Sequence, residues 1–597
     1  MPFEDSRRLT GGNLFFASTG AVLDARVPMD DGLLDAWRAR VQGAGARLGW
    51  PHRHSVARRH AGGTLLAIAA PYDQLFLATE VNEWALCASL AEREPAGWAG
   101  LEQALIAAAL DADEGSPQPP SDLRPVLDAA SALARFERLA SLESQPQLRA
   151  LLDAAGSRGL PHVVDELELT LGSGAGGRSF SMAALPTVAD VPWQELRDIP
   201  TAIVTGSNGK TTTVRLLAAC ARSHGWHVGY NCTDGVYLDE EVRATGDYSG
   251  PAGARLVLRE RRTQAAILET ARGGILRRGI AVSRANVAVI TNVSADHFGE
   301  YGIDDLAGLA DVKLTVAAVV APGGLLVLNA DDAQLRARAH ELVRRFERCP
   351  PLGWFAVSEN QNTLRDYGLR GASTCGVREG RLYLTHGGAE HDLGLICAMP
   401  LSMSGIATYN VANMAGAALA AVSLGIAPAT IAAVFARFGS DLKDNPGRMM
   451  RFDVDGVIVL VDYAHNPDGL RGFLKVATHL RGAGSRMGML LGHAGNRQDA
   501  DIAQLAGVAV EFRPDLIVVK EDEGHLRGRA PGEIPRIIRA ELERLGFSTS
   551  MMAMRDSEVE AVRHALEWAR PGDVLALPVH SSSARAAVVA LLEKPRA

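Results

Sequence analysis

The segment TAIVTGSNGKTTT, residues 201 to 213, constrains the fold of this chain more than any other. Its apolar run predicts a buried strand, a glycine-containing turn follows, and a helix is expected to begin near Thr212. Glycines let backbone N–H groups surround a phosphate, and a helix N-terminus adds partial positive charge. The alternative is a tight turn without nucleotide. We expect a phosphate loop, shorter than the usual pattern, made of Gly206, Asn208, Gly209, Lys210, Thr211 and Thr212.

The alternation of short apolar runs with longer helical stretches predicts an α/β protein of three domains. Residues 1–195 carry no phosphate-loop pattern and are expected to form an N-terminal α+β module that binds substrate or polymer. Residues 196–446 predict a central P-loop-type, mostly parallel sheet with helices on both faces. The alternation restarts at residues 447–597, which predict a C-terminal Rossmann-like α/β domain.

Polar residues follow the next two strands of the central segment. The run AAILE ends at Glu269, and VAVITN leads to Asn292, Asp296 and His297. Carboxyl ends of parallel strands meet at one edge of a sheet, where ligands bind. We therefore expect Thr211 and Glu269 to bind Mg²⁺, and His297 to bind a second Mg²⁺ directly or through water. For Lys313, in the helical stretch that follows, the simplest interpretation from the pattern is a lysine at a helix edge.

Further polar clusters fall at strand ends and loops. Asn329 follows GLLVLN, Asn410 and Asn413 open an uncharged helical stretch, and Arg448 lies at the expected boundary between the second and third domains. An arginine at such a junction either clamps a phosphate or forms a structural ion pair. The run VIVLVDYAHNP places three more polar residues directly after a strand: Asp462, His465 and Asn466. Asp462 either caps a turn or accepts ribose hydroxyls, and His465 and Asn466 are candidate substrate residues.

Two charged segments are candidate substrate sites. The cationic segment 272–278 follows Glu269 and could receive an acidic acceptor through Arg272, Arg277 and Arg278, or be a solvated turn. The acidic residues Glu521, Asp522 and Glu523 could recognise a basic amino acid, although an exposed acidic loop is the simpler interpretation.

Composition excludes several classes of function. With 61 Lys and Arg against 69 Asp and Glu, the net charge of −8 recruits neither nucleic acid nor an anionic membrane. The six cysteines lie far apart, so neither a disulfide scaffold nor a zinc knuckle is indicated, and a cytoplasmic location fits best. The uncharged stretch from Asn410 to Ala436 is broken by Gly425 and Pro428, which predicts two buried helices and not a membrane span.

These motifs, in this order, resemble the Mur ligase family, ATP-dependent amide-forming enzymes related to folylpolyglutamate synthetase. The resemblance spans about 400 residues, from Ile199 to the C-terminus. Longer strings are similar to the Mur-ligase-like half of the cyanophycin synthetases. They include YNCTDGVYL, LETARGGILRRG, TYNVANMAGAA, NPGRMMRF and DYAHNPDGL.

The resemblance implies roles for single residues. Lys210 and Thr211 would hold ATP·Mg²⁺, Glu269 and His297 would bind the two metal sites, and Lys313 would be the position that is often carbamylated. Asn329, Arg448 and Asp462 would contact the base, a phosphate and the ribose. Tyr409 stands where the family usually has a histidine.

The opening SRRLTGGNLFF is similar to the amino-terminal module of the cyanophycin synthetases, in which a large ATP-grasp domain follows that module. Here the phosphate loop already begins at Gly206, so we expect the backbone-extending chemistry to be absent.

The function expected is an ATP-dependent carbon–nitrogen ligase that joins an amino acid, as a small-molecule substrate, to an acidic or peptide-like acceptor of a cyanophycin-like aspartate/arginine type. The alternatives are a partner or polymer-binding subunit of a separate synthetase, or a P-loop ATPase or kinase. The resemblance also allows a homo-oligomer.

Overall fold

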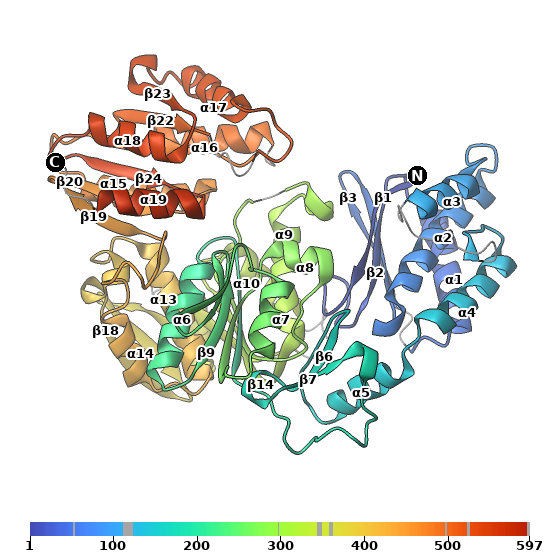
Figure 1. Cartoon of the computed structure of the whole chain (residues 1–597). Coiled ribbons are helices and arrows are strands. Elements are labelled where there is room, and N and C mark those ends of the chain that lie inside the picture. Colours follow the sequence, from blue (N-terminus) through green and yellow to red (C-terminus); the bar gives the residue numbers. More distant parts are fainter. Residues whose placement is uncertain are drawn as a thin grey trace.

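The computed structural model describes residues 1–51, 54–111, 123–296, 298–342, 349–357, 362–495, 498–521 and 526–593. Within these ranges the strands form four sheets, which Figure 1 shows in three successive parts of the chain. Sheets are covered by helices throughout, so the molecule is of the α/β class that the alternating sequence predicts.

The N-terminal part contains an antiparallel sheet of order β1-β2-β4-β3 with helices packed on one face. Its strands are β1 Phe3–Leu9, β2 Gly20–Ala25, β3 Ser55–His60 and β4 Gly63–Ala69, and its helices are α1 Asp31–Arg47, α2 Leu75–Arg93, α3 Leu101–Asp111, α4 Ala129–Glu143 and α5 Pro146–Ser157. A small antiparallel sheet follows, with β5 His162–Val164, β6 Glu168–Leu171 and β7 Arg178–Ser181.

The central sheet has the order β11-β10-β9-β12-β8-β13-β14-β15-β16-β17-β18 among the described residues. All pairings from β9 to β16 are parallel, and antiparallel hairpins close both edges. The strands are β8 Thr201–Thr205, β9 Val228–Cys232, β10 Gly235–Leu238, β11 Glu241–Thr245, β12 Ala265–Glu269, β13 Ala285–Ile290, β14 Val320–Asn329, β15 Leu352–Phe355, β16 Thr374–Arg378, β17 Arg381–His386 and β18 Ala389–Leu395.

Helices cover both faces of this sheet because successive side chains of each strand point to opposite sides. On β8, Ala202 and Val204 belong to one apolar core, whereas Ile203 belongs to the other. The first core includes α6 Lys210–Ser223, α13 Thr408–Ser423 and α14 Pro428–Phe435. The second includes α7 Pro251–Arg259, α8 Arg272–Arg278, α9 Leu306–Leu314, α10 Ala333–Ala339 and α12 Asn362–Leu369.

The C-terminal part is a second mostly parallel sheet of order β19-β20-β24-β21-β22-β23. Its strands are β19 Met450–Val454, β20 Val457–Asp462, β21 Met487–Leu491, β22 Leu516–Lys520, β23 Met552–Arg555 and β24 Val574–Pro578. Helices α15 Pro467–Leu480, α16 Asp499–Glu511 and α17 Glu533–Arg544 contribute to one core, and α18 Glu558–Trp568 and α19 Ser582–Leu592 to the other.

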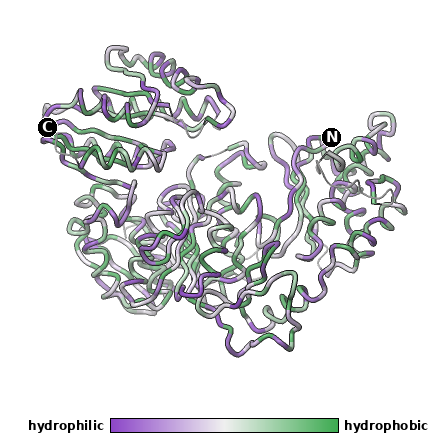
Figure 2. The backbone as a smooth tube through the Cα atoms, viewed as in Figure 1, coloured by the Kyte–Doolittle hydropathy of each residue, from purple (hydrophilic) through white to green (hydrophobic). Residues whose placement is uncertain are grey.

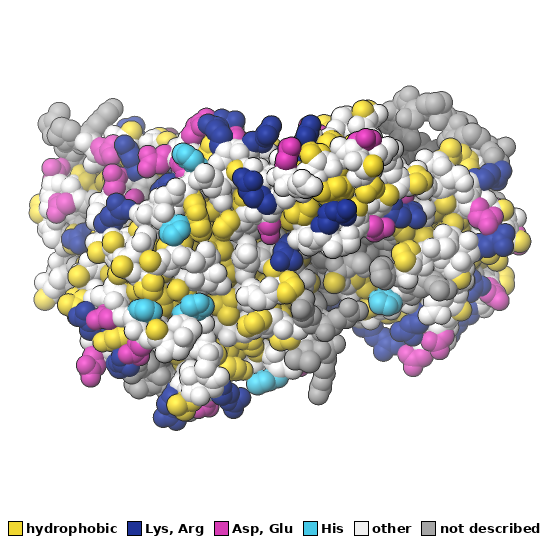
Figure 3. Space-filling model, turned by 90° about the horizontal axis from the view of Figure 1, so that it is seen from below, with side chains coloured by type: hydrophobic (Ala, Val, Ile, Leu, Met, Phe, Trp, Pro, Cys, Tyr) yellow, Lys and Arg dark blue, Asp and Glu magenta, His cyan; other side chains and the backbone are white. Residues whose placement is uncertain are grey.

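Hydrophobic residues lie on the strands and on the helices that cover them (Figure 2). Basic and acidic side chains are interspersed on the face seen from below, in keeping with the small net charge (Figure 3). The uncharged stretch after Asn410 folds as the two helices α13 and α14, as its sequence predicts. No helix in the described ranges is both long and apolar enough to span a bilayer.

The N-terminal part is joined to the central part through backbone hydrogen bonds as well as side chains. Thr10 N donates to Arg278 O over 2.8 Å, and Ile280 N donates to Gly12 O over 2.8 Å. A Cβ on Gly11 would lie 2.0 Å from Ile280 O, so only glycine allows this approach. Strand β1 therefore lies against α8, the helix that carries the cationic segment (Figure 1).

Candidate active site

The turn between β8 and α6 has the conformation that a phosphate loop needs. Gly206 has φ +150° and Gly209 has φ +82°, values that are strained for any residue with a side chain. A Cβ on Gly206 would lie 1.8 Å from Thr291 Oγ1, and one on Gly209 would lie 2.1 Å from Asn413 Oδ1. Both glycines are therefore required by space as well as by backbone angle. Helix α6 begins at Lys210, two residues before the expected start.

The loop is held by residues that follow β13. Asn208 N donates to Asn292 Oδ1 over 2.9 Å, and Thr291 Oγ1 donates to Asn208 O over 2.5 Å. Ser207 Oγ donates to Ser294 O over 3.0 Å. These contacts fix the loop before any ligand arrives, so the backbone pays little ordering entropy on binding.

The side chains of Lys210 and Thr211 each form hydrogen bonds within the protein. Lys210 Nζ donates to the loop carbonyls of Gly206 and Ser207 over 3.1 and 3.0 Å. Thr211 Oγ1 donates to Glu269 Oε2 over 2.8 Å. The cationic group therefore lies over the loop that would hold phosphate, and the hydroxyl lies beside a carboxylate.

Glu269 ends β12 and its side chain is buried. Burial raises its pKa, and the nearby Lys210 ammonium opposes that rise. Thr233 Oγ1 donates to Glu269 Oε1 over 3.0 Å, so each carboxylate oxygen has a hydroxyl neighbour. Hard oxygen ligands next to a phosphate loop fit Mg²⁺, which is held by one or two carboxylates together with substrate phosphates. Thr211 and Glu269 are the residues that would hold it.

Lys313 lies in α9, where only 2% of it is exposed, and it lines the same cleft as Lys210 and Glu269. The interpretation of a lysine at a helix edge is therefore wrong. Burial lowers its pKa well below the usual value, and the positive charge of Lys210 acts in the same direction. Asp296 lines the cleft as well. His297, the predicted second metal ligand, lies outside the described residues.

A pocket of about 390 Å³ extends from the phosphate loop to the junction of the central and C-terminal parts. That volume is of the size that binds small molecules. Asn329, Arg448 and Asp462, the residues expected to contact nucleotide, all line it. Arg448 Nη2 lies 3.4 Å from Thr211 Oγ1, at the phosphate end. Burial raises the pKa of Asp462, which Arg448 opposes.

Tyr409, which stands where the resemblance leads us to expect a histidine, lines this pocket. Its hydroxyl oxygen is buried and has no hydrogen-bond partner within the described part of the chain. Burial raises its pKa well above the usual value, so it is a neutral donor. Its ring packs against α15, where a Cβ on Gly472 would lie 3.1 Å from Tyr409 Cδ1.

A larger cleft of about 1140 Å³ continues from the loop and is lined by all three parts of the chain. Its walls carry charges of both signs, including Asp5 and Asp24 from the N-terminal part and Arg527 from the C-terminal part. The cationic segment also lines it, through Arg272, Arg277 and Arg278. The cleft is large enough for an acceptor and an amino acid together.

The cationic segment is a helix, α8, and not a solvated turn. Arg272 is buried and forms an ion pair with Glu300, so it contributes to the wall of the cleft. The side chains of Arg277 and Arg278 are exposed in the last turn.

His465 and Asn466 follow β20 and face the central part. His465 Nε2 lies 4.0 Å from Asp296 Oδ2, and His465 lines both the pocket and the cleft. Asn466 is buried: it caps α15 by accepting from Gly469 N over 2.8 Å, and it donates to Asn208 Oδ1 over 2.9 Å. Asn466 thus contacts the phosphate loop directly.

The interpretation of an exposed acidic loop is wrong for Glu521, which is buried and accepts a hydrogen bond from Gly532 N. Asp522 and Glu523 lie outside the described residues. Beside Glu521, Lys520 is buried and ion-paired with Glu558, which explains how a lysine can end a core strand.

Sequence reasoning missed Thr233, Asp234 and Arg585. Thr233 and Asp234 follow β9, which neighbours β12, so the rule that selected Glu269 would also have selected them. Arg585 lies one turn into α19, directly after the last strand of the C-terminal sheet, and pairs with Asp234. Nothing in its sequence context distinguishes Arg585 from a surface arginine.

This phosphate loop, with its strand-end carboxylate and a nucleotide-sized pocket between two α/β parts, is the arrangement of a Mur ligase. The chain matches the Mur ligase middle domain over residues 204–421 and the Mur ligase glutamate ligase domain over residues 447–577. It is 31% identical to the UDP-N-acetylmuramoyl-L-alanyl-D-glutamate–2,6-diaminopimelate ligase of Alkalilimnicola ehrlichii, over 62% of this chain and 69% of that one. The chain belongs to the Mur ligase family of ATP-dependent carbon–nitrogen ligases.

Among its relatives is the cyanophycin synthetase of Nostoc sp., which is 35% identical over 398 residues. The match covers 66% of this chain but only 42% of that synthetase, so the chain spans less than half the length of this relative. A solved structure of E. coli FolC in complex with ADP is 16% identical, with a TM-score of 0.46, over 66% of this chain and 89% of that chain.

Proposed function

We propose that the chain activates a substrate carboxylate with ATP and joins it to the amine of an amino acid, releasing ADP and phosphate. The observation that carries the proposal is the shared cleft: Lys210, Glu269 and Lys313 line one cavity with the cationic helix α8 and the C-terminal part. A nucleotide and two further reactants would therefore meet in one space.

In the first step a carboxylate oxygen attacks the γ-phosphorus, and the bond to the ADP oxygen breaks. Lys210 and the N-terminus of α6 would neutralise charge on the moving phosphoryl group. Mg²⁺, bound by Thr211 and Glu269, would supply further charge neutralisation. In the second step the amine attacks the acyl carbon of the mixed anhydride, loses a proton, and inorganic phosphate leaves. Closure of the cleft would exclude water from the anhydride.

We propose the other site residues in matching roles. Asn329, Arg448 and Asp462 would contact base, phosphate and ribose, and His297 would bind a second metal ion. Lys313 would carry a carbamate: burial favours its neutral amine, the form that adds to CO₂, and the carbamate would orient Mg²⁺.

We propose an acidic or peptide-like acceptor, of the aspartate/arginine type that the similarity to cyanophycin synthetases suggests. Arg277 and Arg278 would face its carboxylates, and His465 with the C-terminal part would face the incoming amino acid. The division into an N-terminal module (1–195), a central ATP-binding domain (196–446) and a C-terminal domain (447–597) belongs to the same proposal. We further propose a cytoplasmic enzyme that acts as a homo-oligomer or together with a partner synthetase that forms the backbone.

The test is phosphate release from ATP across a panel of amino acids, with and without β-aspartyl or polyaspartate acceptors, followed by mass analysis of the product. Release that requires both an acid and an amine, together with a product heavier by one amino acid less water, supports the ligase. ATP turnover that needs neither would contradict it. The variant Lys210→Ala should lose at least about 100-fold in rate.

A further inference from the structure

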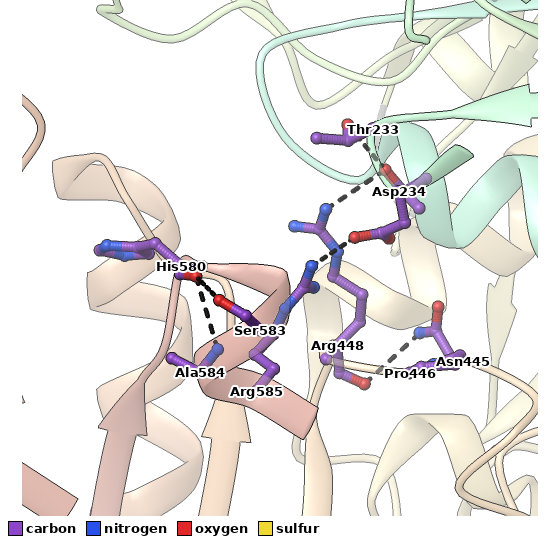
Figure 4. Close-up of polar contacts among 12 residues, drawn as sticks. Thr233, Asp234, Asn445, Pro446, Arg448, His580, Ser583, Ala584 and Arg585 are labelled. Carbon is purple, nitrogen blue, oxygen red and sulfur yellow. Dashed lines mark hydrogen bonds and ion pairs between the residues drawn. The ribbon is translucent and has the colours of Figure 1, made fainter. Parts of the chain in front are cut away.

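Asp234 lies in the turn after β9, and its carboxylate joins arginines from two parts of the chain. Asp234 Oδ2 accepts from Arg215 Nη2 over 2.7 Å. Asp234 Oδ1 accepts from Arg585 Nη2 (Figure 4). Arg215 belongs to α6, the helix that follows the phosphate loop, and Arg585 belongs to α19 of the C-terminal part. All three side chains are at most 12% exposed.

The two arginines enclose the peptide that connects the central and C-terminal parts. Arg215 Nη1 donates to Pro446 O over 2.9 Å. Arg585 lies against the next residue: a Cβ on Gly447 would lie 2.3 Å from Arg585 Nη1, and Gly447 has φ +72°. The connecting peptide 445–448 therefore contacts two guanidinium groups, both of which are bound to the Asp234 carboxylate.

This peptide ends at Arg448, the residue that reaches the phosphate end of the nucleotide pocket. The guanidinium groups of Arg448 and Arg585 lie 4.2 and 5.5 Å from the centre of the Tyr463 ring. Burial alone would raise the pKa of Asp234, but the positive charges of Arg215, Arg448 and Arg585 hold it below the usual value. The carboxylate is thus ionised while it binds two of the three arginines.

We propose that Asp234 is a positioning residue, which clamps the connecting peptide between Arg215 and Arg585 and thereby aims Arg448 at the phosphates of the nucleotide. The inference rests on the proposed function to the extent that the pocket takes ATP. Without the clamp the C-terminal part would turn about residues 445–448, and Arg448 would move away from Thr211.

The first test measures the clamp without nucleotide. One spin label is attached to the exposed Cys397 and a second to the cysteine of Glu543→Cys, in a background that carries Cys349→Ser. Pulsed electron paramagnetic resonance then gives the distribution of distances between the two labels. We expect one narrow distribution in the parent, and broad distributions after Asp234→Asn or Arg585→Gln. Unchanged distributions in both variants would overturn the proposal, whatever the ligand or the reaction.

The second test measures binding of a fluorescent ATP analogue. We expect Asp234→Asn and Arg585→Gln each to weaken binding about 10-fold, and the double variant to be no worse than either, because both remove one interaction. Asp234→Glu and Arg585→Lys should recover part of the loss. Arg259→Gln, which removes an ion pair to Asp165 far from the connecting peptide, should bind normally.

These results separate positioning from a stabilising ion pair. If Asp234→Asn lowers the melting temperature but binds the analogue like the parent, the positioning role is overturned. If the parent itself fails to bind the analogue while the distance distributions broaden as expected, the clamp holds and the proposed function fails.

Discussion

Thr211 donates its hydroxyl proton to Glu269 over 2.8 Å, although 58 residues separate the two along the chain. The parallel pairing of β12 with β8 produces this contact, because it aligns Glu269 with Val204 at the edge from which the phosphate loop leaves the sheet. A cation bound between these residues would be coordinated by both side chains, in place of the hydrogen bond that now joins them.

Glu269→Gln should lower the rate of phosphate release at least about 100-fold, because the amide cannot neutralise a metal ion. The folded state should not be weakened, since the buried carboxylate already resists ionisation. Steady-state rates across a Mg²⁺ titration, with melting temperatures in parallel, check both parts. A variant that reaches the parental rate at saturating Mg²⁺ would show that Glu269 is not a required ligand.

Lys313 should form a carbamate when the protein is equilibrated with ¹³C-labelled bicarbonate, because its neutral amine is favoured by burial. The expected observation is one protein-bound carbamate signal by ¹³C NMR, absent from Lys313→Arg. Removal of dissolved CO₂ should lower the rate of the parent. The exposed Lys475 in Lys475→Arg is the matched control, and loss of the signal in that variant instead would assign the carbamate elsewhere.

Tyr409→Phe should raise the Michaelis constant for ATP about 5-fold, because one hydrogen bond from the hydroxyl to the nucleotide is lost. The turnover number should change little. The same change should leave the melting temperature of the nucleotide-free protein equal or higher, because it removes a buried hydroxyl without a partner. Tyr367→Phe, on α12, serves as the control. A lower melting temperature with an unchanged Michaelis constant would mean that the hydroxyl is bound within the protein.

Glu83 gives the fold a predictable pH dependence. Burial in α2 raises the pKa of its carboxyl from 4.5 to about 7, so the folded state holds a proton that the unfolded state releases. The contribution of Glu83 to the free energy of unfolding is therefore highest below about pH 4.5. It falls as the pH rises to 7, by at most about 3 kcal/mol. The melting temperature of Glu83→Gln should therefore exceed that of the parent at pH 8. At pH 5 the two melting temperatures should be equal.

Calorimetry at the two pH values checks this expectation. Glu137→Gln, at an exposed carboxylate of α4, is the control and should shift neither curve by more than a degree or two. An equal gain at both pH values would point to packing, and not to ionisation, as the source of the effect.

The sequence predicted the strands well where a continuous apolar run ends at a polar residue. The apolar run that ends at Glu269 is β12, and the run before Asp462 is β20, because strands buried on both faces are continuously apolar. The family and the ligase class were also identified correctly from ordered motifs.

Contacts between distant elements were beyond a local reading of the sequence. Arg585 pairs with Asp234 across 351 residues. Residues 272–278 form a helix where the sequence favours a turn, because glycine has a low helix propensity. Glu521 looks exposed from its acidic neighbours, yet its partner Gly532 N lies eleven residues further along the chain.

The hydrogen bonds between residues 10–12 and residues 278–280 have a practical consequence for anyone who engineers this chain. A truncation that begins after Gly12 would leave Ile280 N and Arg278 O without their backbone partners and uncover one side of α8. An affinity handle is therefore better attached through a spacer ahead of Met1 than substituted for the opening strand.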